Sequence, residues 1–359
     1  MLASRRHEII LAEVRRHGTV RLADLVERLG VSAVTVRRDV TALADRGLVV
    51  RVHGGITLPY TADQRAPVPG GTLVGMVVPS VEYYWPHVVQ GAQAAVAAAG
   101  GRLVLRASSY DPAEDRRQIT KLLERGVRTV LAAPTVAGSA GADLLRWLGG
   151  LPVPVVLVER LPPPELPTLA LDAVTTAHSL GAGLAVRHLV TLGHRSIALV
   201  TTRSSPTTRA LRAGWRETTA ELGLVPPEGM AALDHEVPSY GSPGWAAAYD
   251  DVLDRCQDQG TAALLVHSDR EAIGMVERAL DRGIAVPGEL AVVSYDDEVA
   301  AASDPPLTAV RPDKHRLGTV AADLALTRAA TTSVHPVHRV QIWPTLAVRD
   351  SCGASRPSL

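Results

Sequence analysis

Two adjacent arginines, Arg37 and Arg38, lie on a predicted helix that follows a short turn. A guanidinium group binds the edge of guanine through two hydrogen bonds or clamps a phosphate, so such a pair on one helix face suits duplex DNA. The alternative is a solvated helix face with Asp39 or Asp45 as surface ion-pair partners. Since Ser32 is a good N-cap for this helix and an amphipathic helix precedes the turn, DNA binding is the favoured interpretation.

Other side chains extend this candidate DNA-binding surface. Two of them, Arg51 and His53, lie on a predicted β-hairpin, where they can meet the DNA backbone or the minor groove. Hydroxyl groups on and before the third helix can add phosphate or base contacts. The residues predicted to contact DNA are Ser32, Thr35, Arg37, Arg38, Thr41, Arg51 and His53.

The elements that must position these residues are predicted from hydrophobic spacing. Helices are expected over 5–17 and around 22–29, and a third follows Ser32 and stops at Gly47. Strand-like segments at 48–52 and 56–58 form the hairpin, or wing. In the third helix an inner stripe of Val36, Val40 and Leu43 places Ala33, Val34, Arg37, Arg38 and Thr41 on the outer side.

Charge divides the chain in the same place. The formal net charge is zero, with 37 basic and 37 acidic residues, but residues 1–60 carry +4 and the remainder −4. A basic head on an acidic body is typical of nucleic-acid binding by the head alone, although four charges is a modest excess. Residues 59–71 contain three prolines and two glycines and are predicted to be a linker after a head of residues 1–58.

After residue 71 short apolar runs alternate with helix-like segments. This pattern indicates an α/β domain with parallel sheets covered on both faces. The rhythm pauses at the proline-rich stretch 159–175 and restarts, which suggests two similar lobes. The predicted strands are 72–78, 102–107, 128–133, 153–158, 196–201, 261–267 and 290–294, and the predicted helices are 86–99, 113–125, 176–192, 208–222, 244–258 and 270–282.

Several chemistries are excluded or lack support. Two cysteines, Cys256 and Cys352, cannot build a disulfide framework or a four-ligand zinc site. There is no dinucleotide-binding or phosphate-binding glycine loop, and His188 and His194 have a spacing that places them on different helix faces. We therefore expect no catalysis, no cofactor and no metal. The lack of an apolar span or signal core predicts a cytoplasmic protein with no membrane partner.

The head resembles the DeoR-type winged helix-turn-helix. The motifs that carry this resemblance occur in order: Arg5-Arg6, Leu29-Gly30-Val31-Ser32, Thr35-Val36-Arg37-Arg38-Asp39, Gly47-Leu48 and Arg51-Val52-His53-Gly54-Gly55. The resemblance implies operator recognition with Arg37 and Arg38 as the principal contacts. It does not say which of the two touches a base.

The body is similar to the LacI/GalR effector domain, which has the two-lobed periplasmic-binding-protein fold. Matching stretches include 73–79, 155–160, 188–198, 212–215, 268–274, 283–287, 292–297, 305–311 and Arg349-Asp350. The resemblance implies a ligand-binding domain over 72–350, with three crossings between the lobes and a frayed tail at 351–359. The expected first lobe comprises about 72–168 and 308–330, and the second about 169–307 and 331–350.

In such a fold the ligand lies between the lobes, at the carboxyl ends of the strands. There Tyr83, Tyr84 and Trp85 can stack on a sugar ring, or else serve core packing or subunit contact. Arg160 offers a planar donor fork to hydroxyls or a carboxylate, or else pairs with Glu159 or Glu165.

Carboxylates are the other candidate ligand contacts. Asp269 can accept hydrogen bonds from hydroxyl groups, although it also suits a helix N-terminus, and Asp296 is the single residue most expected to meet ligand. Asp297 is instead assigned to the turn and hinge. Tyr240 is a candidate wall of the second lobe, whereas Trp245 is expected in the core.

The chain departs from the family pattern at several positions. Leu211 occupies the place of a usual arginine, which leaves Arg209 or Arg212 as candidates for that role, and Ser268 replaces a usual asparagine. The Asp-Asn pair usual near the lobe crossing is matched to Asp172-Ala173. The linker would form the family's hinge helix poorly, because of its prolines and glycines.

These inferences predict a ligand-responsive DNA-binding transcriptional regulator. We expect a homodimeric repressor whose affinity for a double-stranded operator is controlled by a small carbohydrate bound between the lobes. The alternatives are a solute-binding protein of a sugar transporter and a sugar-acting enzyme.

Overall fold

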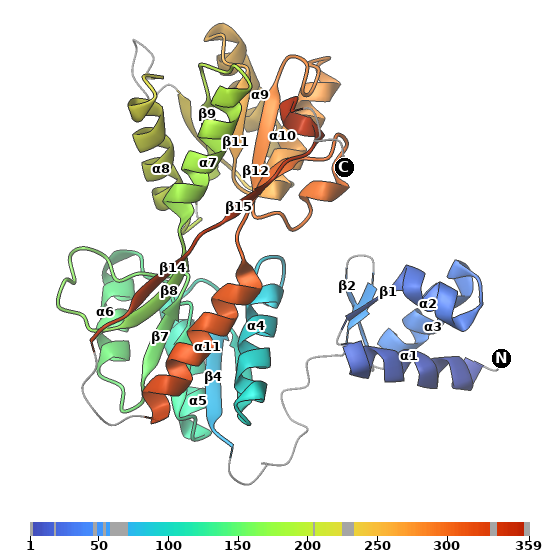
Figure 1. The fold of residues 1–359 in the computed structure, drawn as a ribbon, viewed down its shortest axis with the longest axis vertical. Coiled ribbons are helices and arrows are strands. Elements are labelled where there is room, and N and C mark those ends of the chain that lie inside the picture. Colours follow the sequence, from blue (N-terminus) through green and yellow to red (C-terminus); the bar gives the residue numbers. More distant parts are fainter. Residues whose placement is uncertain are drawn as a thin grey trace. The chain divides into compact units, whose positions relative to one another are not determined.

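The computed structural model divides the chain into two compact units, Met1–Pro69 and Gly70–Leu359. We call them the head and the body and describe each by itself (Figure 1). The structure describes residues 3–17, 19–45, 49–52, 55–57, 71–203, 205–224, 233–330 and 336–354.

The head is a winged helix-turn-helix, as predicted. Three helices surround a small antiparallel sheet whose strand order is β1-β3-β2. The strand β1 was not expected to join the wing. The elements are α1 (Ala3–His17), β1 (Thr19–Arg21), α2 (Leu22–Leu29), α3 (Ala33–Asp45), β2 (Val50–Val52) and β3 (Gly55–Thr57).

One apolar core holds the three helices of the head together. Ile10 of α1, Leu25 of α2, and Val36 and Leu43 of α3 are fully buried and pack in one cluster. Val14, Leu29 and Val40 join this cluster at a spacing of four residues from Ile10, Leu25 and Val36, so one stripe of each helix is turned inward. The opposite face of α3 is thereby left for solvent or a partner.

The first lobe of the body has a six-stranded sheet of order β14-β8-β7-β6-β4-β5, with every pair parallel. Helices α4 and α11 pack on one face, and α5 and α6 contribute to a second apolar cluster. The elements are β4 (Leu73–Val78), α4 (Trp85–Ala98), β5 (Arg102–Ala107), α5 (Pro112–Glu124), β6 (Thr129–Ala132), α6 (Gly138–Gly149), β7 (Val155–Val158), β8 (Asp172–Thr176), α11 (Lys314–Ala330) and β14 (Arg339–Ile342).

The second lobe repeats this plan around one large core. Its sheet has the order β10-β9-β11-β12-β13-β15, and only the β13–β15 pair is antiparallel. The elements are α7 (His178–Thr191), β9 (Ala198–Thr202), α8 (Thr208–Glu221), β10 (Asp234–Val237), α9 (Trp245–Asp258), β11 (Ala263–Val266), α10 (Asp269–Asp281), β12 (Ala291–Tyr295), η2 (Ala300–Ala302), β13 (Thr308–Arg311), β15 (Thr345–Ala347) and η3 (Asp350–Cys352).

The chain crosses between the lobes three times, as expected, but the expected lobe boundaries are wrong. The crossings are β8 to α7, β13 to α11 and β14 to β15 (Figure 1). Strand β8 lies between β7 and β14, so it belongs to the first lobe rather than the second. Strand β13 pairs with β12 and belongs to the second lobe. The backbone hydrogen bonds of these strands decide their membership, and apolar patterning alone does not reveal them.

Glycines allow α4 and α11 to pack closely in the first lobe. A Cβ atom at Gly318 would lie 1.9 Å from the carbonyl oxygen of Val88, and one at Gly91 would lie 1.9 Å from that of His315. Backbone atoms cannot withdraw as a flexible side chain can, so any larger residue must separate the two helices.

We predict that Gly318→Ala destabilises the body by about 1–3 kcal/mol, because the added methyl group overpacks the α4–α11 contact. The matched control is Gly150→Ala, where the new Cβ would lie 3.6 Å from the Trp147 carbonyl oxygen, an ordinary contact, and φ is −96°. Urea unfolding measures both. Equal stability of the two variants would contradict the close packing.

Candidate functional site

A largely buried ion pair holds α3 of the head against α1. The Asp39 carboxylate on α3 accepts hydrogen bonds from Arg6 Nε at 2.6 Å and from Arg6 Nη2 at 3.1 Å. His7 Nε2 lies 3.2 Å from Asp39 Oδ1. The hydrogen bonds from Arg6 outweigh burial and lower the pKa of Asp39. Asp39 is therefore buried against α1 rather than a surface partner of Arg38.

The outer face of α3 is exposed where the sequence predicts it. The side chains of Ser32, Val34 and Arg38 are exposed, while Thr35 and Thr41 are half-buried. Ser32 caps α3, since its Oγ accepts the Thr35 backbone N–H at 3.3 Å and lies 3.0 Å from Thr35 Oγ1. The side chains of Arg37 and Arg51, and the whole of His53, lie outside the described residues.

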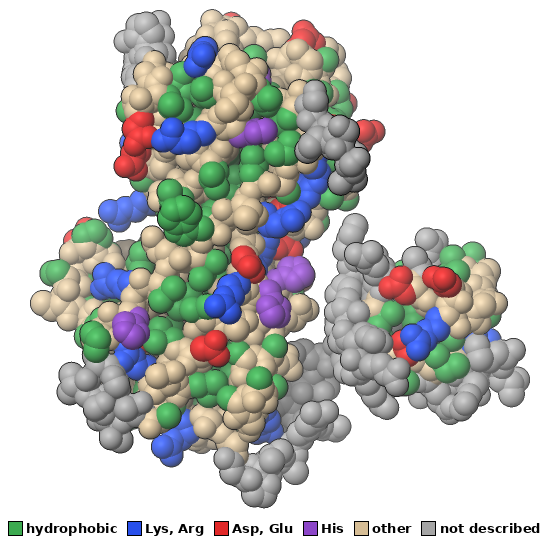
Figure 2. Space-filling view, viewed as in Figure 1, with side chains coloured by type: hydrophobic (Ala, Val, Ile, Leu, Met, Phe, Trp, Pro, Cys, Tyr) green, Lys and Arg blue, Asp and Glu red, His purple; other side chains and the backbone are tan. Residues whose placement is uncertain are grey.

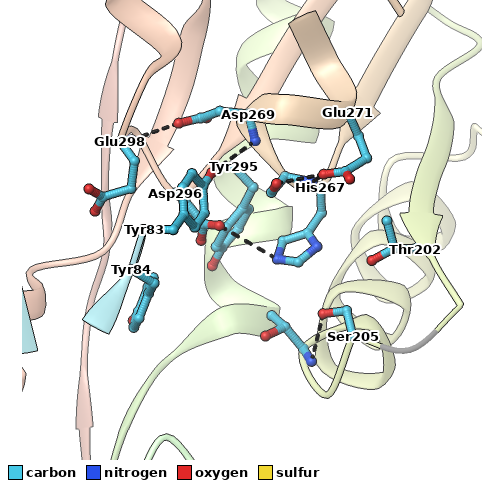
Figure 3. Close-up of polar contacts among 12 residues, drawn as sticks. Tyr83, Tyr84, Thr202, Ser205, His267, Asp269, Glu271, Tyr295, Asp296 and Glu298 are labelled. Carbon is cyan, nitrogen blue, oxygen red and sulfur yellow. Dashed lines mark hydrogen bonds and ion pairs between the residues drawn. The ribbon is translucent and has the colours of Figure 1, made fainter. Parts of the chain in front are cut away.

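In the body, titratable side chains gather where the carboxyl ends of the two sheets face each other. Figure 3 shows Asp269, His267 and Asp296 beside Tyr83, Tyr84 and Tyr295. On the face shown in Figure 2, acidic, basic and histidine side chains likewise gather around the junction of the lobes. Parallel strands bring their ends to one edge, so residues far apart in sequence meet there.

Glu159, which directly follows β7, is buried and fully engaged. Its carboxylate accepts hydrogen bonds from the Thr176 backbone N–H at 3.0 Å, from Thr176 Oγ1 at 2.6 Å and from Tyr84 Oη, while His178 Nε2 lies 3.1 Å away. Burial alone would raise the pKa of Glu159, but the charge of His178 and these hydrogen bonds lower it to about 2.

His178 connects the two lobes through its two ring nitrogens. While Nε2 faces Glu159 of the first lobe, Nδ1 lies 3.1 Å from Tyr295 Oη at the end of β12 in the second. Gly181 makes room for that hydroxyl, because a Cβ atom there would lie 2.4 Å from Tyr295 Oη. The first crossing between the lobes is thus tied to both sheets by one imidazole.

Asp269 has a structural role, and its contact with a ligand stays a prediction. Its Oδ1 accepts from Ser294 Oγ at 2.7 Å and from the Asp297 N–H at 3.3 Å, and its Oδ2 accepts from the N–H groups of Glu298 and Val299 at 2.6 and 3.0 Å. The side chain is fully buried. With four intramolecular donors, Asp269 holds the loop after β12 in place.

Asp296 lies beside it and lacks such partners. Among the residues that the structure describes, no hydrogen-bond donor reaches its carboxylate, and His267 Nε2 is 3.9 Å from Oδ2. Burial, followed by the charge of Asp269, raises the pKa of Asp296 well above its ordinary value. Burial lowers the pKa of His267 to about 4, and His267 Nδ1 is buried without a hydrogen-bond partner. Two adjacent groups at this junction are therefore incompletely satisfied.

The backbone around this junction is strained. Within the described residues, five non-glycine residues have φ between 55° and 104°, and each follows a strand of the first or second lobe: Tyr83, Tyr110, Glu159, Asp296 and Asp297. Each such conformation costs about 1–3 kcal/mol, and such residues cluster at functional sites.

The aromatic candidates have different environments. The Tyr83 hydroxyl accepts the Asp269 backbone N–H at 3.3 Å across the lobes, and Arg270 lies 5.0 Å from its ring centroid. The half-buried Tyr84 hydroxyl donates to Glu159. Trp85 is buried in the first-lobe core, as its packing alternative expected.

Arg160 is buried at the same edge. Its Nε donates to the backbone carbonyl of Pro134 at 3.1 Å. Its Nη1 donates to the backbone carbonyl of Glu159 at 2.7 Å. It is therefore held by backbone oxygens rather than by the carboxylates of Glu159 or Glu165, and remains a candidate for ligand contact.

The side chains of two further predicted ligand residues pair with groups outside this junction, and their contact with a ligand stays a prediction. Arg212 pairs with Asp234, the first residue of β10, and with Glu236 at 3.1 Å, so it lies toward the amino end of that strand. Tyr240 Oη donates to Glu277 at 2.7 Å, two turns along α10 from the cleft. Arg209 is exposed near the start of α8 and stays a candidate.

The pair expected at the lobe crossing is also elsewhere. Asp172 begins β8 and accepts hydrogen bonds from Arg328 at 2.6 and 2.8 Å and from the His338 N–H at 2.7 Å. Ala177-His178 occupies the crossing instead. His178 could have been found from its place just after β8, but neither that strand nor a role for His178 was predicted.

Lys314, at the start of α11, was also missed. Its Nζ is 2.7 Å from Glu298 Oε1 and donates to the Asp296 carbonyl. Within the described residues, no group of three or more His, Cys, Asp or Glu side chains is arranged to hold a metal ion. In the same residues no helix is long and apolar enough to cross a membrane.

The comparison with known proteins agrees with this architecture. Residues 6–62 match the DeoR-like helix-turn-helix domain and residues 186–352 the periplasmic binding protein-like domain. The transcriptional regulator GalR of Escherichia coli is 30% identical over 94% of this chain and 96% of its own. The chain belongs to the LacI/GalR family of transcriptional regulators.

One further relative and one solved structure are also similar to this chain. The arabinose metabolism transcriptional repressor of Geobacillus stearothermophilus is 24% identical over 91% of this chain and 89% of its own. A structure of the transcriptional regulator CelR in complex with cellobiose superimposes with a TM-score of 0.66 and 25% identity, covering 89% of this chain and 91% of CelR. The predicted fold and the predicted regulatory function are confirmed.

We predict that Asp39→Asn loosens the head, because Arg6 loses its charged partner. Since the pKa of Asp39 is lowered in the folded state, its stabilisation is present above the ordinary aspartate pKa and is lost as pH falls. Hydrogen exchange of α3 amides in the full chain should accelerate about ten-fold at pH 7 and less at acidic pH. Glu27→Gln, an exposed control on α2, should leave exchange unchanged; equal effects would contradict the role of Asp39.

We predict that Asp296→Asn stabilises the unliganded protein by about 1–3 kcal/mol at pH 7 to 8. A raised carboxyl pKa means that the ionised form destabilises the fold, so wild-type stability falls as pH rises through that pKa. The advantage of the variant should therefore vanish at acidic pH. Urea unfolding from pH 5 to 8 checks both statements.

The neighbouring carboxylate supplies a control of opposite sign. Asp297 accepts a hydrogen bond from Arg311 and forms an ion pair with Arg349 at 2.8 Å. Asp297→Asn should thus destabilise. If both variants destabilised, Asp296 would be shown to have partners as good as those of Asp297.

Proposed function

We propose that this regulator is a repressor that binds a small carbohydrate between the two lobes of the body and releases its operator in response. The observation that carries the ligand site is the buried Asp296 carboxylate beside the unpartnered His267 Nδ1. Sugar hydroxyls donate and accept hydrogen bonds, so one ring with adjacent hydroxyls could satisfy both groups.

The surrounding side chains support a ring-shaped polar ligand. The Tyr83 and Tyr84 rings lie at this junction and offer apolar faces, and Arg160 adds a buried guanidinium. Known relatives support the same ligand class, since one is named for arabinose metabolism and another was solved with cellobiose. A sugar would replace part of the direct contact that Tyr83 now makes with Asp269 across the lobes.

Coupling to DNA follows from the connectivity of the first lobe. Strand β4 starts at Leu73, soon after the segment that joins the head, and its other end leads to Tyr83 and Tyr84. A ligand that binds one arrangement of the lobes more tightly shifts the population toward that arrangement. Two heads of a homodimer reading two half-sites would convert this shift into a change of operator affinity.

The ligand site is tested by thermal-shift measurements on the full chain with a panel of pentoses, hexoses and disaccharides that includes arabinose and cellobiose. At about 100 times its Kd, a true ligand stabilises by about 2.7 kcal/mol, which raises the Tm by several degrees. We expect at least one sugar to raise the Tm of the wild type but not that of Asp296→Asn.

The matched control is Asp281→Asn on the exposed end of α10, which should keep the wild-type response. A response of Asp296→Asn equal to that of the wild type, or no response of the wild type to any sugar, would overturn the proposed site.

A further inference from the structure

The outer face of α3 carries an apolar side chain that folding does not explain. Val34 is 73% exposed, the most exposed large hydrophobic side chain in the part of the chain that the structure describes. Its neighbours Ala33 and Arg38 are also exposed, whereas Val36 and Val40 pack in the head core. Valine is a poorer helix former than alanine, because the preceding turn restricts its χ1 angle, so helix stability does not favour it here.

This face is positive or neutral. The positions predicted to face outward, 33, 34, 37, 38 and 41, hold alanine, valine, two arginines and threonine. The acidic residue among them in sequence, Asp39, is turned inward and held by Arg6. The Asp39 carboxylate therefore does not repel a negatively charged duplex at this face.

Val34 is the second residue of α3, at the end that a recognition helix points toward base edges. In the major groove an aliphatic side chain can make a favourable specific contact with one feature, the C5 methyl group of thymine. We propose that Val34 reads a thymine methyl group in the operator half-site. The inference rests on the DNA-binding function of the head and adds a residue that determines sequence preference.

The distance between Val34 and Arg38 on α3 limits how far apart their two contacts with DNA can lie. Residues 34 and 38 are one helical turn apart, about 6 Å, on the same face. Successive base pairs rise about 3.4 Å, so the thymine lies within about two base pairs of the site contacted by Arg38. Val34 supplies discrimination between bases, whereas a guanidinium contributes to affinity for any duplex if it contacts phosphate.

The test begins with selection of an operator from random duplexes by the full-length protein. Each thymine of the selected half-site is then replaced by deoxyuridine, which keeps the hydrogen-bonding groups and removes the C5 methyl. Kd values are measured by fluorescence anisotropy at fixed salt. For the wild type we expect one thymine per half-site at which the replacement weakens binding about four-fold, the effect of one buried methyl group.

Variants assign that methyl group to Val34. In Val34→Ala the thymine-to-uracil ratio of Kd values at this position should fall to about one, while thermal unfolding stays that of the wild type. In the control Arg38→Ala, binding should weaken on both duplexes and the ratio should remain about four.

Three outcomes would overturn the inference. Val34→Ala could keep the ratio, or the wild type could show no thymine that depends on its methyl group, while specific binding persists. Selection of no sequence at all would instead remove the DNA-binding function on which the inference rests.

Discussion

An ionised carboxylate buried between two sheets must be met by donors, and this constraint organises the body. Burying a charge without partners costs several kcal/mol, so each acidic group at the lobe junction needs its own network. Glu159 has Tyr84, Thr176 and His178, and Asp269 has Ser294 and three backbone N–H groups. Among the described residues, the side chain nearest to pairing with the Asp296 carboxylate is His267, at 3.9 Å. This difference is the reason that Asp296, rather than Glu159 or Asp269, is proposed to meet the ligand.

The head also contains a buried carboxylate that needs partners, and there an ion pair supplies them. Asp39 lies in the middle of α3. If its carboxylate pointed outward, it would repel the phosphates of a DNA duplex and weaken binding. Its burial against Arg6 and His7 satisfies the charge and fixes α3 on α1. One interaction thus stabilises the head and keeps the Asp39 carboxylate off the outer face of α3. In the proposed function, a bound ligand would offset the cost of the incompletely satisfied Asp296 in the body.

Much of the fold was predictable because alternating buried strands and amphipathic helices leave a strong pattern. The strands missed by the sequence analysis, such as β8 (DAVTT) and β14 (RVQI), are short and contain polar residues, so their pairing rather than their composition defines them. The place of Asp296 at the carboxyl end of a buried strand was predictable from the sequence. The direction of Arg212 and Tyr240 was not, because their partners Asp234 and Glu277 come from other elements. Nor does sequence reveal that the loop after β12 folds back onto Asp269.

In this account, a ligand bound at Asp296 and His267 in the body controls the affinity of the head for DNA. The most direct measurement is the operator Kd of the full chain, by fluorescence anisotropy at fixed salt, with and without the sugar that raises its Tm. We expect the sugar to weaken operator binding at least ten-fold in the wild type and to leave Asp296→Asn unchanged. An operator Kd that does not respond to a sugar bound by the wild type, or that tightens, would contradict the claim.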